Sequence, residues 1–141
     1  MPGDPLDDGP PLMTRRFTRG DLFEVRRSLA DHVAGQGLTG TRAQDFVLAV
    51  HESMTNAIDH GGGSGQLQLW RTDRLLCCQI SDKGPGMPDG RHDGFLDGCR
   101  LPDHDSVGGR GLWIIAQLSD VAHVVSGAGG TVVQIAVRLP G

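Results

Sequence analysis

The chain has 141 residues, of which 38% are hydrophobic and 21% are charged, and its formal net charge is -4. These values are typical of a single globular domain with one core. The acidic balance, without a long cluster of Lys or Arg, argues against a nucleic-acid partner.

The start of the chain and its cysteines indicate a cytoplasmic protein. Residues 1–13 are rich in Pro, Gly and Asp and lack the apolar core of a signal peptide, so we expect a disordered leader before one domain over residues 14–141. No stretch approaches the roughly 20 apolar residues of a membrane span. Cys77, Cys78 and Cys99 have no CxxC spacing, which favours reduced thiols over a disulfide framework or zinc site.

Two helices are expected next. Apolar side chains recur at intervals of three and four over residues 20–32, which predicts a helix with one buried face. A second helix, capped by Thr39 or Thr41, carries a longer apolar stripe. We expect this helix to end in a left-handed cap at Gly61, a conformation that glycine adopts at little cost.

The second half of the chain predicts two hairpins separated by a loop and a helix. Residues 66–72 alternate in polarity and residues 75–81 are mostly apolar, as in paired strands. Some thirty residues dense in Gly, Pro, Asp and His follow, and a loop this long is usually functional or disordered. A helix over residues 111–120 and strands over 121–127 and 131–140 complete the pattern. The predicted fold is an α/β sandwich with helices on one face of a largely antiparallel sheet.

The second helix stacks a carboxylate on a carboxamide, because Glu52 and Asn56 are one helical turn apart. An amide oxygen suffices as one ligand of a magnesium ion that also keeps several waters and binds phosphates. The acid can then hold a hydroxyl nucleophile in line with a terminal phosphorus. Taken alone, the pair could equally be solvated helix surface.

A glycine-rich turn follows the second predicted strand. Asp82, at the end of that strand, can accept a hydrogen bond from an exocyclic amine such as that of adenine. Gly84 and Gly86 would let the backbone pass close to the ring. Taken alone, this motif could be an ordinary tight turn.

A second glycine motif precedes the third predicted helix. Gly109 and Gly111 leave backbone N-H groups free at a helix start, where phosphates bind readily, and Arg110 adds a positive charge. Taken alone, the motif could be only a helix start. The order of the three motifs nevertheless predicts one nucleotide pocket, with residues 87–108 as a lid that orders over the nucleotide.

These motifs resemble three sequence boxes of the GHKL ATP-binding superfamily. ESMTNAIDHG is similar to the N box, DKGPG to the first glycine box and GGRGL to the second. The nearer resemblance is to the anti-sigma factor serine kinases (the SpoIIAB/RsbW-like group) and extends over residues 14–139. It implies a Bergerat-type two-layer α/β sandwich with a mixed, largely antiparallel sheet, ATP and Mg2+ as cofactors, and a possible homodimer.

The resemblance also implies roles for individual residues. They are Glu52 as base, Asn56 as magnesium ligand, Asp82 as adenine reader, Gly84 and Gly86 as the floor under the ring, Met87 and Leu112 as further pocket residues, Gly109, Arg110 and Gly111 as phosphate cradle, Thr131 as a partner of Asp82 near the base, and Arg26 as a contact for partner proteins.

The chain departs from the family pattern in two places. Ser53 replaces the alanine common after the glutamate, a small change. The expected lid is unusually acidic, and its carboxylates would repel a nucleotide unless magnesium or the lid's arginines offset them. His92 and His104 in this segment could bind a metal or be solvated, and His60 could reach the pocket or bind the last carbonyls of its helix.

We expect an ATP-dependent serine/threonine-protein kinase that phosphorylates a STAS-domain anti-anti-sigma protein and sequesters a sigma factor, regulating transcription. The alternative is a nucleotide-gated protein-binding module without productive phosphoryl transfer. A histidine kinase fragment is disfavoured, because no phosphoacceptor hairpin fits before the N box, and a gyrase-like or chaperone ATPase would need a following transducer domain.

Overall fold

The described residues fold as one antiparallel sheet with three α-helices on one side. A computed structural model describes residues 11–84, 92–95 and 109–140. The sheet has six strands in the order β1-β2-β3-β6-β5-β4, and every described pairing is antiparallel. The strands are β1 (Pro11–Thr18), β2 (Ser64–Arg71), β3 (Leu75–Asp82), β4 (His92–Phe95), β5 (Val121–Gly127) and β6 (Gly130–Arg138).

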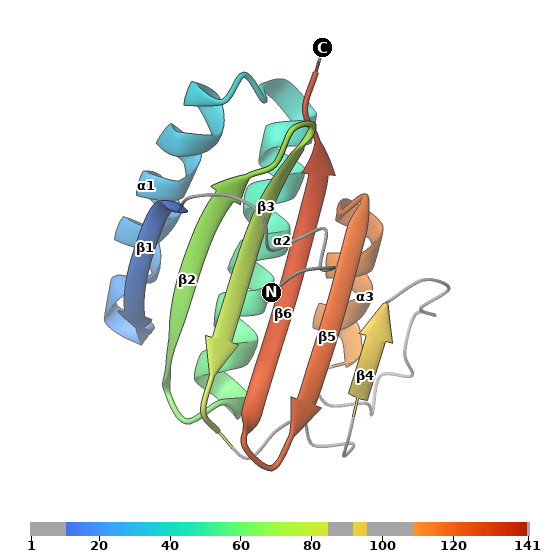
Figure 1. Cartoon of the computed structure of the whole chain (residues 1–141). Coiled ribbons are helices and arrows are strands. Elements are labelled where there is room, and N and C mark those ends of the chain that lie inside the picture. The colour runs from blue at the N-terminus through green and yellow to red at the C-terminus, as the bar shows by residue number, and fades with distance from the viewer. Residues whose placement is uncertain (1–10, 85–91, 96–108, 141) are drawn as a thin grey trace.

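The helices form a single layer. They are α1 (Leu22–Gly35), α2 (Gly40–His60) and α3 (Gly109–Leu118), and a short 3-10 turn, Arg19–Asp21, leads into α1. Figure 1 shows α2 behind the centre of the sheet, α1 behind the β1–β2 edge and α3 behind β5. This arrangement confirms the predicted α/β sandwich. None of the described helices has the length and apolar character needed to cross a bilayer.

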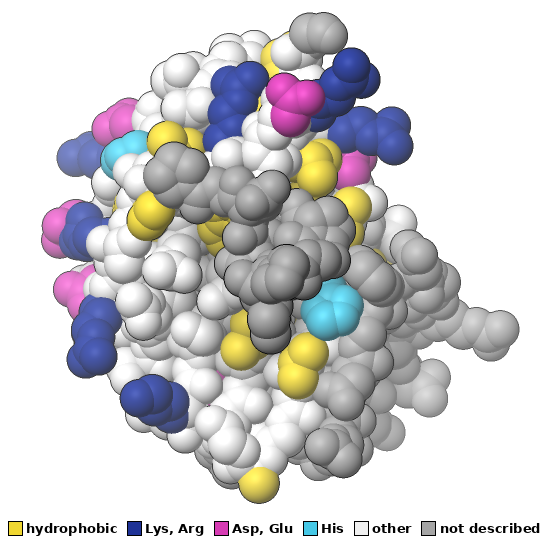
Figure 2. All heavy atoms as spheres, viewed as in Figure 1, with side chains coloured by type: hydrophobic (Ala, Val, Ile, Leu, Met, Phe, Trp, Pro, Cys, Tyr) yellow, Lys and Arg dark blue, Asp and Glu magenta, His cyan; other side chains and the backbone are white. Residues whose placement is uncertain are grey.

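The main core lies between the sheet and the helix layer. Leu67 and Leu69 of β2 and Ile80 of β3 point into it because alternate residues of a strand face the same side. The adjacent cysteines separate as this alternation requires: Cys78 joins the main core, and Cys77 joins a small cluster on the other face. Figure 2 views the molecule from the side of the sheet opposite the helices and shows scattered apolar side chains, with Lys and Arg along the rim.

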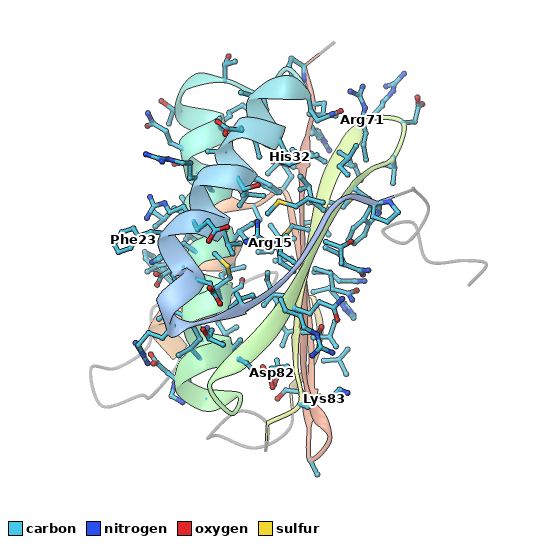
Figure 3. All side chains as sticks on the ribbon, turned by 90° about the vertical axis from the view of Figure 1, so that its left-hand side faces the viewer. Arg15, Phe23, His32, Arg71, Asp82 and Lys83 are labelled. Atoms are coloured by element: carbon cyan, nitrogen blue, oxygen red, sulfur yellow. The ribbon has the colours of Figure 1, made fainter. Side chains whose placement is uncertain are left out.

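Two strands lie where loops were expected. The leader prediction is wrong for residues 11–13, because β1 begins at Pro11 and pairs with β2, while residues 1–10 lie outside the described part of the chain. Arg15 interrupts the apolar alternation of β1, but it faces α1 and donates a hydrogen bond to Glu24 at 2.8 Å (Figure 3). Strand β4 likewise lies within the expected lid. It forms because the backbone of β5 offers hydrogen-bonding groups along its edge, with which β4 pairs.

Helix α2 is fixed to the sheet at its N-terminal end by a polar contact. Arg42 donates hydrogen bonds to the Asp120 carboxylate at 2.8 Å and to the carbonyl of Arg138 at 3.0 Å. The same carboxylate accepts the Arg138 N-H at 2.7 Å. Although burial alone would raise it, the pKa of Asp120 is lowered by these hydrogen bonds and by the two arginine charges.

At its C-terminal end α2 meets β3 through glycine backbone. A Cβ on Gly61 would overlap the Asp82 carboxyl, and a Cβ on Gly84 would overlap the backbone of Gly61. Gly61 has φ -111, so the left-handed cap predicted there is wrong, and positive φ values occur instead at the next two residues, Gly62 and Gly63. Close approach, rather than backbone conformation, therefore requires glycine at position 61.

Replacing Gly61 by alanine should destabilise the fold, because the new methyl group must displace Asp82 or the end of α2. We expect a loss of about 1–3 kcal/mol in the free energy of unfolding, measured by urea denaturation. Gly35→Ala is the control, since a Cβ there meets nothing within 4 Å, and it should be neutral or slightly stabilising. Equal stability of Gly61→Ala and wild type would show that the approach is not restrictive.

Asp120→Asn should lower stability by about 1 kcal/mol at neutral pH, because a charge-assisted contact is lost at a partly exposed site. Since the folded-state pKa of Asp120 is lowered, the contribution is complete above the unfolded value of about 3.9 and disappears as pH falls through the folded value. Thermal melts of wild type and variant should therefore differ equally at pH 7 and pH 5 and converge towards pH 3. Asp31→Asn, at an exposed position without an ion pair among the described residues, is the control and should melt close to wild type at pH 7.

Candidate functional site

Glu52 and Asn56 project from one side of α2. Each residue turns a helix by about 100°, so residues four apart lie within about 40° of each other. Both side chains are half-buried, beside the fully buried Ser53. Val47, which lies about 180° round the helix from Asn56, lines a groove against α1. The acid and the amide therefore share the side of α2 turned away from α1.

The Asn56 amide is suited to a partner from outside the described residues. Its Nδ2 atom is buried and has no hydrogen-bond partner in the part of the chain that the structure describes. A buried amide N-H without a partner costs free energy, so this group requires a water, a ligand or a residue outside the described part of the chain. The described residues contain no group of three or more His, Cys, Asp or Glu that could hold a metal. Asn56 also offers one amide oxygen, a hard donor of the kind that Mg2+ takes together with phosphates and waters.

Asp82 is held in position by two backbone N-H groups. Its Oδ1 accepts hydrogen bonds from Gly84 N-H at 2.9 Å and from Thr131 N-H at 3.3 Å. No described residue donates a hydrogen bond to its Oδ2, and the side chain is only half-buried. A carboxylate that is oriented through one oxygen and open at the other can accept a hydrogen bond from the amino group of a base.

Thr131 contributes to this arrangement through both its backbone and its hydroxyl. It faces Asp82 across the β3–β6 ladder and Ser126 across the β5–β6 ladder. The Ser126 and Thr131 hydroxyls are 2.8 Å apart and both residues are buried. Ser126 was not predicted, and its only signal in the sequence is its register opposite Thr131 in the last hairpin.

Gly130 was also missed, although it precedes Thr131 directly. A Cβ at this position would overlap the carbonyl oxygen of Asp82 and approach Lys83 Cα at 3.0 Å. Its φ of +127 is a conformation that other residues rarely adopt. Gly130 thus lets the last hairpin close against the end of β3.

The second glycine motif opens a helix, as predicted. Helix α3 begins at Gly109, so the free N-H groups of its first turn belong to residues 109–112. The Leu112 side chain packs into the main core, so only its backbone is available to a ligand. The side chain of Arg110 and the predicted pocket residues Gly86 and Met87 lie outside the described part of the chain, as does most of the expected lid.

Arg26 lies apart from Glu52 and Asn56. It lines the groove between α1 and α2. It also acts on His51: burial lowers the pKa of this histidine and the charge of Arg26 lowers it further, against a smaller opposing effect of Glu52. The residue expected to contact partners thus faces the α1 side of α2, whereas the predicted chemistry is on the other side.

A cavity of about 630 Å³ lies at the end of β3, where Asp82 and Lys83 line it. Its walls include Arg16 and Thr18 of β1, Gln66 of β2, and Gly61. Neither Glu52 nor Asn56 is among the residues that line it. Figure 3 shows Asp82 and Lys83 at the end of the sheet where this cavity opens.

Comparisons with solved structures support the fold. The crystal structure of the RsbU and RsbW domains of Rv1364c from Mycobacterium tuberculosis is 19% identical with a TM-score of 0.62, covering 91% of this chain and 32% of that one. The histidine kinase domain of the blue-light activated histidine kinase EL346 from Erythrobacter litoralis is 23% identical, with a TM-score of 0.52, over 85% of this chain and 60% of that one.

A third solved structure, the catalytic domain of the histidine kinase ThkA, is 13% identical with a TM-score of 0.53 and covers 92% of this chain and all of that domain. The chain thus spans only about a third of the Rv1364c structure. At these identities the likeness concerns the fold. A search of curated proteins gave no significant match.

The sequence model of the histidine kinase-like ATPase domain matches residues 17–137, which is most of the chain. The matched region includes the α2 face with Glu52 and Asn56, the Asp82 carboxylate and the start of α3. ATP binding is the property that this domain implies. The chain therefore belongs to the histidine kinase-like ATPase domain family.

Proposed function

We propose that the protein is an ATP-dependent serine/threonine kinase of the anti-sigma factor type, acting in the cytoplasm. The observation that carries this proposal is the joint arrangement on α2 and β3. Glu52 shares one helix face with Asn56, whose Nδ2 has no partner among the described residues. The end of that helix approaches, through Gly61, the Asp82 carboxylate, whose Oδ2 accepts no hydrogen bond from a described residue.

Each group has a defined task in this proposal. The oriented Asp82 carboxylate accepts a hydrogen bond from the adenine amino group, which selects ATP over GTP because guanine presents a carbonyl at the corresponding position. The free N-H groups at the start of α3 bind phosphate oxygens. Asn56 provides one oxygen ligand for magnesium, and the ion would neutralise charge on the phosphates.

Glu52 is the base. Its carboxylate lies one helical turn from Asn56, so it can accept the proton of a serine or threonine hydroxyl that attacks the terminal phosphorus. The bond from the attacking oxygen to phosphorus forms as the bond to the bridging oxygen of ADP breaks. The acceptor is proposed to be a STAS-domain anti-anti-sigma protein, and the protein also binds a sigma factor. This choice of partner rests on the resemblance of the three sequence motifs to the anti-sigma factor serine kinases.

Removal of the Glu52 carboxylate should nearly abolish phosphoryl transfer while leaving ATP binding almost unchanged. In Glu52→Gln, ATP affinity measured by calorimetry should remain within about threefold of wild type, while transfer of labelled phosphate to the STAS protein falls by about 100-fold or more. The control is Asp45→Asn, which removes an acid two turns earlier on a similar side of α2, and it should leave transfer unchanged. Undiminished transfer by Glu52→Gln would rule out this base.

Asn56→Ala should instead weaken binding. Because the amide is proposed to hold the ion that bridges the phosphates, calorimetry with magnesium ATP should show an affinity at least about tenfold lower. The magnesium dependence should shrink as well. Wild-type affinity with an intact magnesium requirement would contradict the role of Asn56.

The nature of the phosphorylated residue can be tested on the product. Phosphoserine and phosphothreonine survive acid, whereas phosphohistidine is hydrolysed, so label retained after acid treatment supports the serine/threonine assignment. Label lost in acid would favour histidine kinase chemistry. ATP binding by wild type with nucleotide-dependent partner capture but no transfer would favour the nucleotide-gated binding module.

A further inference from the structure

The helix layer contains a groove between α1 and α2, with a volume of about 750 Å³. Its floor is apolar: Val33 and Val47 are buried, and Ala30 and Ala43 lie beside them. The residues of α1 that line it run from Phe23 to Val33, about three helical turns. An apolar trough between two helices is the kind of surface on which a third helix packs.

Phe23 stands at this groove with 88% of its surface exposed, more than any other large apolar residue described. Figure 3 shows it projecting from α1 away from the sheet. An exposed aromatic ring beside an apolar trough is a typical anchor of protein interfaces, because burying its large area contributes strongly to binding.

The charges at the groove select the partner's chemistry. Arg26 and Arg27 both line it, and neither forms an ion pair with any of the described residues. The acidic lining residue, Glu24, is already engaged by Arg15 at 2.8 Å. The groove is thus apolar and positively charged, which matches an occupant that is apolar and acidic.

We propose that this groove docks an amphipathic helix of a partner protein, whose apolar stripe covers Phe23 and the groove floor and whose acidic flank pairs with Arg26 and Arg27. The proposal rests on the proposed function in one respect: it takes Arg26 to be a residue that contacts a partner protein. Docking itself needs neither nucleotide nor Glu52, because the groove lies on the side of α2 away from Glu52 and Asn56.

Two synthetic helical peptides of about 18 residues probe the groove. Both carry leucines at positions i, i+3, i+4 and i+7, and the flanking positions are glutamate in one and lysine in the other. Fluorescence anisotropy with the full chain, without nucleotide, should show binding of the acidic peptide and at least about tenfold weaker binding of the basic peptide. Absence of binding, or equal affinity for both peptides, would overturn the proposal.

Groove variants give a sharper result. Phe23→Ser should lower the affinity for the acidic peptide by about tenfold or more. The double variant Arg26→Glu/Arg27→Glu should bind the basic peptide more tightly than the acidic one. The matched controls are Leu48→Ser, an exposed apolar residue of α2 outside the groove lining, and Arg74→Glu, an exposed residue of the β2–β3 turn. Both controls should bind as wild type does, and circular dichroism checks that every variant is folded.

Two further measurements separate this proposal from its rivals. Glu52→Gln should bind the acidic peptide as wild type does, so loss of the kinase reaction and loss of docking are distinguishable. Sedimentation at increasing concentration tests self-association. A wild-type dimer that Phe23→Ser converts to monomer would assign the groove to a second copy of this chain and overturn the partner proposal.

Discussion

The site depends on the close approach of glycine backbone at the end of α2 to the end of β3. A Cβ on Gly61 would overlap the Asp82 carboxyl, and a Cβ on Gly84 would overlap the backbone of Gly61. Gly130 approaches the carbonyl oxygen of Asp82 just as closely. The approach of Gly61 places the C-terminal end of α2 against the Asp82 carboxylate. A side chain on Gly61 or Gly84 would push the end of the helix away from the end of β3, and one on Gly130 would push β6 away from the same strand end.

Helix α2 presents different groups on its two sides. Glu52 and Asn56 are on the side away from α1, whereas Val47 lines the groove that contains Arg26, and the charge of Arg26 lowers the pKa of His51. The helix is held at its start by Asp120 and at its end by Gly84, so it can act as one rigid element. Partner docking and phosphoryl transfer, as proposed, would then use opposite sides of the same helix, and any coupling between them would pass through it.

The fold is shared with structures that are only 13–23% identical, with TM-scores of 0.52–0.62. This is expected physically, because a core between sheet and helices needs the right pattern and volume of apolar side chains more than particular residues. The polar groups of the site, in contrast, require particular hydrogen-bond partners at particular positions. Asp82 needs two N-H donors on one oxygen, and these come from Gly84 in the following turn and from Thr131, 49 residues away.

The sequence alone was sufficient for the helices, the two hairpins and the sharing of one face by Glu52 and Asn56, because local periodicity governs these features. It was insufficient for β1 and β4, whose alternation is interrupted or short and whose strands form only by pairing with β2 and β5. The sequence also suggested a left-handed helix cap at Gly61, where close approach is the actual requirement for glycine. It did not indicate that Gly130 or Ser126 contributes to the site. Their roles arise from contacts between distant segments, which no local pattern records and which only the tertiary structure decides.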